Sequence, residues 1–364
     1  MQIDIEDVLA LGDSVDKLLA QYPAGVASLQ ALKQPDVLRK ETEAQLAELG
    51  VRYLFNPVAS GGVDLRAQAL LALRCGSNLF HGASLFQDVI GAYVVSQLEQ
   101  LPAGLSAASL AEGAWSVTVP LANDPMVQAV QAVQAQAQAN SGWVLQGVVP
   151  TVPYASESTH VLLPVQVDGV QRYALLALNA EGVQARHSVA VDGTSISALQ
   201  LRHVAIASDA MLQGEKLEAA LAQGQRHATL LLCFEAVGLI EQVLRKTTEY
   251  LQIRKQFGKA IGSFQALQHR MVGILLMLEQ TRSAADLALE AMLAGAQDQH
   301  MRLSAAKYAV GVNGQKVAEE CVQLHGGIGM TWELDTAHYA KRLLMLDHYF
   351  DNADQSLTHI MAAL

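Results

Sequence analysis

The sequence RKQFGKAIGSFQ, residues 254–265, interrupts a long region whose apolar residues recur with a helical period. Downstream of it that period runs through Phe264, Leu267, Met271, Ile274, Leu275 and Leu278. A second glycine-rich stretch, QLHGGIGM at residues 323–330, lies further along the same region. Gly258 and Gly262 permit a tight turn between two helices. These stretches therefore mark the connections of a helical domain.

Working outward, the residues from 212 to 364 keep helical texture throughout, and Gly295 and Gly326 stand where helix C-caps are expected. Long amphipathic helices bury their apolar stripes most simply in a bundle. We therefore expect residues 212–364 to form a C-terminal four-helix-bundle domain. Residues 1–104 also show helical spacing, for example at Val8, Leu11 and Val15, and predict an N-terminal helical domain that ends near Pro102 and Gly104.

Between these blocks, residues 105–211 predict a middle β domain. Short runs rich in Val, Leu and Tyr alternate with turn signals such as Asp168-Gly169. Strands are expected over residues 143–149, 160–167, 172–178 and 199–205. The low-complexity stretch 127–140 favours a helical or loose excursion, because it consists largely of Ala and Gln. The predicted fold class is α+β, in the order helices, sheet, helical bundle.

The composition limits the classes of function. Asp and Glu number 35 against 24 Lys and Arg, the formal net charge is −11, and the sequence pI is about 5.4. This balance argues against a nucleic-acid or anionic-membrane partner. Three widely separated cysteines fit a reducing compartment, and we find neither a signal-peptide pattern nor an apolar run long enough to span a bilayer. We expect a cytoplasmic protein.

The two glycine-rich stretches have the chemistry of a phosphate site. Arg254 offers a planar fork of donors that suits phosphate oxygens. Gly326 and Gly327 lack side chains, so their backbone can approach an anion or an adenine ring closely. An isolated arginine at a helix end or a lone Gly-Gly pair has simpler explanations, and only the joint spacing favours a ligand site.

Together, RKQFGxxIGxFQ and QxHGGxG resemble the acyl-CoA dehydrogenase family, and the helix–sheet–helix order agrees over nearly the whole chain. The resemblance implies an acyl-CoA dehydrogenase-like fold, FAD as cofactor, and a site that holds the ADP half of FAD for the neighbouring subunit. It also implies that the cofactor residues are Arg254, Gln256, Phe257, Gln265, Gln323, Gly326 and Gly327.

The flavin-ring segments depart from the family pattern. Where the family has ALTEP followed by GSD, this chain has Ser109 to Ser116, with Ala111 in place of the threonine. The second ring segment corresponds to residues 148–156, where Thr151, Tyr154 and Ser156 keep hydroxyl groups. As a pocket for the flavin ring, the site looks degraded.

The catalytic base is also missing from both of its usual places. The family needs a carboxylate within hydrogen-bond reach of the substrate's α-proton. Counting from the motifs places Phe350 and Ala228 at the two positions. Asp351 would serve if the alignment slips by one residue, although it also fits a cap of the last helix. Glu235 is better explained as a surface or buried, paired carboxylate. No metal-ligand motif is present.

The leading hypothesis is an acyl-CoA dehydrogenase-type flavoprotein subunit for α,β-dehydrogenation of an acyl-CoA thioester. It would lend the ADP-binding half to a second acyl-CoA dehydrogenase subunit in a heteromer, with an electron-transfer flavoprotein as acceptor. The alternatives are a self-sufficient homotetrameric dehydrogenase that uses Asp351, and a non-enzymatic structural subunit without FAD. The intact Arg254 segment argues against the last.

Overall fold

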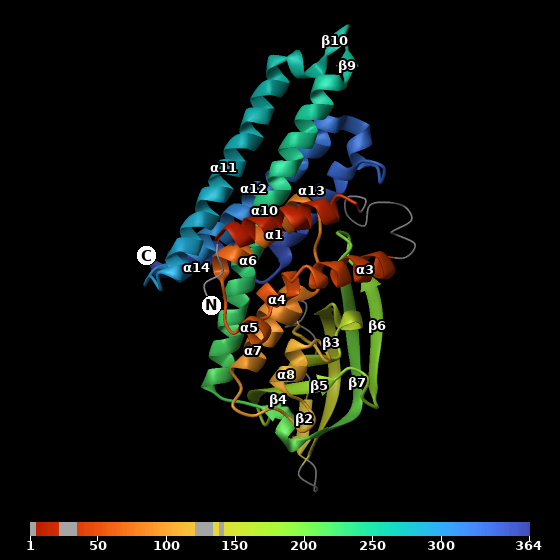
Figure 1. The fold of residues 1–364 in the computed structure, drawn as a ribbon, viewed down its shortest axis with the longest axis vertical. Coiled ribbons are helices and arrows are strands. Elements are labelled where there is room, and N and C mark those ends of the chain that lie inside the picture. Colours follow the sequence, from red (N-terminus) through yellow and green to blue (C-terminus); the bar gives the residue numbers. More distant parts are fainter. Residues whose placement is uncertain (1–4, 22–34, 121–133, 138–141) are drawn as a thin grey trace.

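A computed structural model describes residues 5–21, 35–120, 134–137 and 142–364 of the chain (Figure 1). Helices come first, a sheet follows, and long helices make up the remainder. This order confirms the expected α+β class. The sheet lies at one end of the molecule and the hairpin of α10 and α11 extends to the other (Figure 1).

The N-terminal part is a set of short helices. They are α1 (Ile5–Leu19), α3 (Pro35–Glu48), α4 (Val51–Phe55), α5 (Pro57–Ser60), α6 (Leu65–Ser77), the π-helix η2 (Leu85–Ala92), α7 (Tyr93–Ser96) and α8 (Ala107–Ala111). Side chains cap several of them: Asp64 accepts from Ala67 N at 3.1 Å to begin α6, and Asn56 accepts from Val58 N at 3.0 Å to begin α5. The last of these short helices, α8, precedes the first strand.

The sheet occupies the region where strands were expected. Its strands are β1 (Val117–Thr118), β2 (Gln134–Ala137), β3 (Gly142–Pro153), β4 (His160–Val167), β5 (Val170–Ala177), β6 (Val183–Val189), β7 (Ser195–Ala207) and β8 (Met211–Leu212). The order is β6-β7-β3-β2-β4-β5-β8, and β1 pairs in parallel with β4. Its own apolar core includes Leu145, Val161, Leu163, Leu199 and Val204. Short 3-10 turns η3 (Ala155–Glu157) and η4 (Ser208–Ala210) flank it.

One secondary-structure prediction is wrong within this sheet. Residues 134–137 form strand β2 rather than a helical or loose excursion. Strand β2 pairs antiparallel with β3, with Gln134 opposite Gln146 and Ala137 opposite Trp143. The helix preference of Ala and Gln is worth only tenths of a kcal/mol per residue, so pairing with β3 overrides it. Residues 127–133 and 138–140 lie outside the described residues.

The C-terminal part is a bundle of long helices, as expected. They are α10 (Glu215–Ile253), α11 (Gln265–Leu293), α12 (Gln299–His325), α13 (Asp335–His348) and α14 (Ala353–Ala363). Two short strands, β9 (Lys255–Gln256) and β10 (Lys259–Ala260), and the turn η5 (Ile261–Ser263) join α10 to α11, while η6 (Gly326–Met330) follows α12. Figure 1 shows β9 and β10 at the far tip of the α10–α11 pair.

Helix α10 crosses the middle of the protein and packs tightly on α6. A Cβ atom at Gly238 would lie 2.1 Å from Leu73 O, and one at Gly76 would lie 2.2 Å from Glu235 O. Only glycine permits this approach of the two backbones. By length and composition α10 would also pass as a membrane span, but 78% of its apolar window is buried inside the protein, as in a core helix.

Candidate functional site

The RKQFG segment forms an exposed hairpin between α10 and α11. Strands β9 and β10 pair Lys259 with Gln256, and Ile261 N donates to Arg254 O at 2.8 Å. The turn places Phe257 and Gly258 at φ values of 54° and 80°. A left-handed phenylalanine is uncommon, and its side chain is 91% exposed. The hairpin therefore presents an aromatic ring that packs on little of its own chain.

Positive charge surrounds this ring. Arg254, Lys255 and Lys259 are all exposed, and Lys259 Nζ lies 4.3 Å from the centre of the Phe264 ring. We find no ion pair between these three cations and a carboxylate among the residues that the structure describes. Unpaired cations beside an aromatic ring suit a ligand that carries phosphates and a flat base.

The second motif lies beside the first. Helix α12 ends at Gly326, which has φ 67°, and a Cβ atom at Gly327 would meet nothing within 4 Å. The ring of Tyr250, one turn before the hairpin, lies 4.6 Å from the ring of His325, and its hydroxyl donates to His325 O at 3.3 Å. Buried His325 hydrogen-bonds Cys321 O through Nδ1 at 2.8 Å. The structure therefore brings the two sequence segments together.

All the predicted cofactor residues reach the surface. The exposed set is Arg254, Gln256, Phe257, Gln265, Gln323, Gly326 and Gly327. Charge, open glycine backbone and amide donors together fit the pyrophosphate and adenine end of a dinucleotide. The same exposure suits a surface that completes a site in a second protein chain better than it suits an enclosed pocket.

The segments that would face the flavin ring use their hydroxyl groups within the chain. The Tyr154 hydroxyl lies 3.3 Å from His81 Nδ1, and Ser156 Oγ lies 2.8 Å from Ser195 Oγ. Ala111, at the end of α8, offers no side-chain donor. Tyr154 is held with φ 53° and is almost completely buried. These side chains serve the protein's own packing.

Aromatic side chains fill the space around Tyr154. The Phe86 ring has its centre 5.9 Å from those of Tyr154 and Tyr349 and 6.0 Å from that of Phe350. These separations fall within the range of favourable aromatic pairs. The cluster joins η2, the end of β3 and the segment after α13.

Neither predicted base position carries an acid. Ala228 is completely buried in α10, and Phe350 has φ 60°. Asp351 Oδ2 lies 3.3 Å from His359 Nδ1. The suggestion that Asp351 caps the last helix is wrong, because Asn352 caps α14 in a capping box with Gln355.

Sequence reasoning missed the strongest polar feature, a buried cluster around Arg342. Its guanidinium contacts both Glu235 oxygens, at 2.6 and 3.0 Å, and donates to Asp192 Oδ2 at 2.7 Å. Burial alone would raise the pKa of Asp192, but Arg342 lowers it below its usual value. The cluster links α10, α13 and the turn between β6 and β7. Glu235 is thus a buried, paired carboxylate, one of the two roles favoured for it above.

Next to this cluster lies a cavity of about 290 Å³ between α3, α4, α6 and α10. Its walls are mainly apolar and include Leu46, Val51, Phe55, Phe80 and Leu231, with Glu235 and Arg342 among the lining residues. A volume of this order is at the lower end for small-molecule sites. The sequence held no signal for it, because the walls come from six separate parts of the chain.

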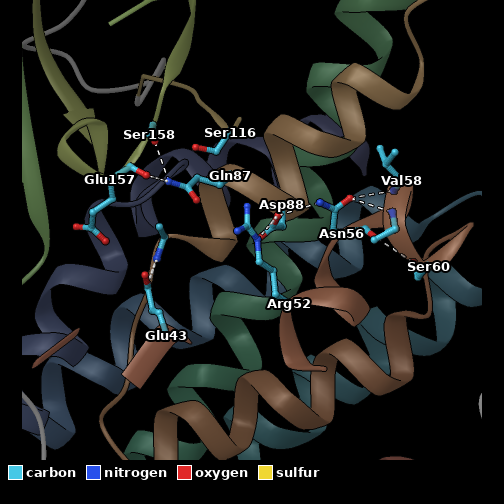
Figure 2. Close-up of polar contacts among 12 residues, drawn as sticks. Glu43, Arg52, Asn56, Val58, Ser60, Gln87, Asp88, Ser116, Glu157 and Ser158 are labelled. Carbon is cyan, nitrogen blue, oxygen red and sulfur yellow. Dashed lines mark hydrogen bonds and ion pairs between the residues drawn. The ribbon is translucent and has the colours of Figure 1, made fainter. Parts of the chain in front are cut away.

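Figure 2 shows the polar contacts near this cavity. Buried Asp88 accepts hydrogen bonds from Arg52 Nε at 3.3 Å and from Asn56 Nδ2 at 3.2 Å. Burial raises the pKa of Asp88, although Arg52 opposes this. Gln87 Nε2 donates to Glu157 O at 2.9 Å, which connects η2 to the sheet. These contacts hold η2 in place, and π-helical turns of this kind are frequent near functional sites.

The C-terminal helices decide the relationship of this chain to known proteins. Residues 219–351 match the model of the acyl-CoA dehydrogenase C-terminal domain. This part of the chain is therefore similar to the C-terminal domain of the acyl-CoA dehydrogenases. Two curated acyl-CoA dehydrogenases from Mycobacterium tuberculosis are similar to part of this chain. The acyl-CoA dehydrogenase IpdE2 is 38% identical over 32% of this chain and 34% of its own length, and the acyl-CoA dehydrogenase FadE34 is 33% identical over 37% and 19%.

Each of these alignments thus spans about a third or less of the relative. Solved structures extend the likeness to the whole chain. The ChsE4-ChsE5 complex from Mycobacterium tuberculosis matches with a TM-score of 0.83, 21% identity, and coverage of 100% of this chain and 98% of that one. A glutaryl-CoA dehydrogenase from Mycobacterium smegmatis in complex with FADH2 matches with a TM-score of 0.84, 19% identity, and coverage of 99% and 95%. The whole chain therefore has the acyl-CoA dehydrogenase fold.

Proposed function

We propose that this chain is a subunit of an acyl-CoA dehydrogenase-type flavoprotein that carries out α,β-dehydrogenation of an acyl-CoA thioester, and that it lends the ADP-binding half of the FAD site to a second subunit. The proposal rests on the contrast between the two parts of the expected FAD site. The exposed hairpin and η6 keep the full cofactor motif. In the segment expected to face the flavin ring, the Tyr154 and Ser156 hydroxyl groups instead hydrogen-bond within the chain.

The ADP half of the cofactor fits the residues present. Arg254, Lys255 and Lys259 form an exposed cationic group on the hairpin, with no carboxylate partner in the described part of the chain. The open backbone at Gly327 leaves room for a close approach. Charge-assisted bonds from these donors to phosphate oxygens would be among the stronger hydrogen bonds available to the protein.

The residues at the expected catalytic positions fit the reaction less well than the hairpin fits the ADP half of the cofactor. FAD, when bound, supplies the acceptor for hydride from the substrate's β-carbon, and a protein carboxylate must remove the α-proton. Neither Ala228 nor Phe350 can hold a proton. The aromatic cluster of Phe86, Tyr154, Tyr349 and Phe350 includes one of these two positions. We infer that a partner subunit brings the base and the ring pocket, and the structural likeness to the ChsE4-ChsE5 complex supports a two-subunit arrangement.

The cofactor part of the proposal is tested at Arg254. The variant Arg254→Ala and the control Arg186→Ala, which removes an exposed arginine from strand β6, are each co-expressed with a candidate partner subunit of acyl-CoA dehydrogenase type. A lost charge-assisted contact is worth roughly 1.5–3 kcal/mol, so Arg254→Ala should retain FAD about 10-fold more weakly or worse. Flavin absorbance that survives dialysis equally in both variants would reject the assignment.

The subunit part is tested by expressing this chain alone and with the partner, then measuring flavin content and turnover with a panel of acyl-CoA thioesters. We expect turnover only in the pair, with an electron-transfer flavoprotein or an artificial dye as acceptor. Turnover by this chain alone that disappears in Asp351→Asn would favour a self-sufficient homotetramer. A pair that binds no flavin would favour a structural subunit.

A further inference from the structure

A second cavity, of about 300 Å³, is lined by the C-terminal helices, and the proposal above assigns it no ligand. Its walls come from the first half of α10, the start of α12, the segment after α13, and α14, and they include the base positions Phe350 and Asp351. The polar lining residues are Arg226, His300, Lys307, Asp351, Ser356 and His359. Cationic and hydroxyl groups from separate helices therefore line one cavity.

Arg226 contributes a positive charge that no carboxylate offsets. Its guanidinium donates to Gln223 Oε1, through Nε at 3.0 Å and also through Nη2. Within the described part of the chain it forms no ion pair. The unbalanced charge is felt nearby, since burial and Arg226 together lower the pKa of His300. Arg226 is partly buried, and a partly buried cation without a carboxylate partner favours an anionic ligand.

Lys307 adds an ammonium group to the cavity, beside the guanidinium of Arg226. It is 1% exposed, and its Nζ donates to Asp347 O at 3.2 Å and lies 3.9 Å from Asp347 Oδ1. Burial lowers the pKa of Lys307 despite these neighbours. The carboxylate within the lining, Asp351, pairs with His359. Asp347 is thus engaged by Lys307 and Asp351 by His359, whereas Arg226 has no carboxylate partner among the described residues.

The start of α12 also favours an anionic ligand. Asp298 stands at the N-cap position without a side-chain cap, and the backbone N–H groups of His300 and Met301 have no acceptor among the described residues. The first turn of a long helix carries the positive end of its dipole. His300, Met301 and Ser304 of this helix start all line the cavity.

An orphan hydroxyl provides an independent indication of a ligand. Ser356, in the first turn of α14, lines the cavity and is 1% exposed, yet its Oγ has no hydrogen-bond partner. Leaving such a group unsatisfied costs about 1–3 kcal/mol. A ligand oxygen in the cavity would satisfy it.

We propose that this second cavity binds a compact oxyanion, a phosphate or carboxylate group, held by Arg226, the hydroxyl of Ser356 and the first turn of α12. The site lies within one chain and does not require FAD or a partner subunit. Donors from three helices converge on it, so the bound anion would also brace α14 against α10 and α12.

The test uses the purified full chain and isothermal titration with inorganic phosphate in one arm and acetate in the other, each against potassium chloride of equal ionic strength. We expect saturable binding of at least one anion, and the arm that saturates identifies the class. Arg226→Gln should weaken it about 10-fold or more, and Ser356→Ala about 3-fold or more. Absence of saturable binding in both arms would overturn the proposal.

The control is Arg302→Gln, on the same helix start, where the arginine is paired with Asp298 at 2.8 Å and half-exposed. It should bind the anion within about 2-fold of the parent. Equal weakening in Arg302→Gln and Arg226→Gln would show a general charge effect and reject the site. Far-UV circular dichroism checks folding, and if Arg226→Gln does not fold, an unchanged affinity in Ser356→Ala is sufficient to reject it.

Discussion

Replacing Arg342 with methionine should destabilise the protein more than any change to its exposed charges. Arg342→Met keeps an apolar stem but removes the guanidinium that contacts Glu235 at 2.6 and 3.0 Å and Asp192 at 2.7 Å. The side chains of Arg342, Glu235 and Asp192 are 4%, 10% and 0% exposed. Two buried carboxylates would then lack a counter-ion. Removing one partner of such a group costs about 3–5 kcal/mol.

The effect should also depend on pH. In the parent, the folded-state pKa of Asp192 is lowered, so its contribution to the free energy of unfolding is complete above an unfolded pKa of about 3.9 and is lost as the pH falls through the folded value. Without Arg342, the effect of burial, which raises the pKa of Asp192, loses its main opposing charge. The Asp192 carboxyl group then takes up a proton more readily as the pH falls, so the difference between Arg342→Met and the parent should shrink between pH 7 and pH 5.

The assay is urea unfolding followed by circular dichroism at both pH values. The matched control is Arg66→Met, which removes an exposed arginine that pairs with Glu290 at 3.1 Å. Its cost should stay below about 1 kcal/mol at either pH. The reasoning fails if Arg342→Met loses no more stability than Arg66→Met, or if its deficit is the same at pH 7 and pH 5.

Three further predictions concern packing, titration and backbone strain. Gly238→Ala should lower the free energy of unfolding by about 1–3 kcal/mol or more, because the new Cβ would lie 2.1 Å from Leu73 O. An unchanged melting temperature would contradict the close packing of α6 on α10. Burial and Arg226 lower the pKa of His227 to about 4, so NMR should show its imidazole neutral from pH 8 to pH 5. Its contribution to stability is complete above pH 6.5 and is lost as the pH falls toward 4. Gly326→Ala should cost about 1–3 kcal/mol in thermal unfolding, since alanine is strained at φ 67°, whereas Gly273→Ala, with open space around it, should not.

The order of elements could be predicted from the sequence because burial leaves a local, periodic trace. Apolar residues three and four apart predicted the helices after residue 212, and alternation predicted strands β3, β4, β5 and β7. Strand β2 was not predicted, because no local pattern in its sequence indicates a strand. Its Ala and Gln residues carry helix preference, and only the neighbouring β3 makes them a strand.

The cofactor motif was also visible in the sequence, because its residues lie in two short, continuous segments with glycines at fixed spacing. The sequence by itself therefore determined the fold class, the turn between two helices that carries Arg254, and the lack of an acid at positions 228 and 350. Only the tertiary structure decided which buried side chains meet between these elements and where cavities lie. Arg342 meets Glu235 and Asp192 across separations of 107 and 150 residues. Such contacts, like both cavities, depend on how helices and sheet pack, and no local pattern encodes that packing.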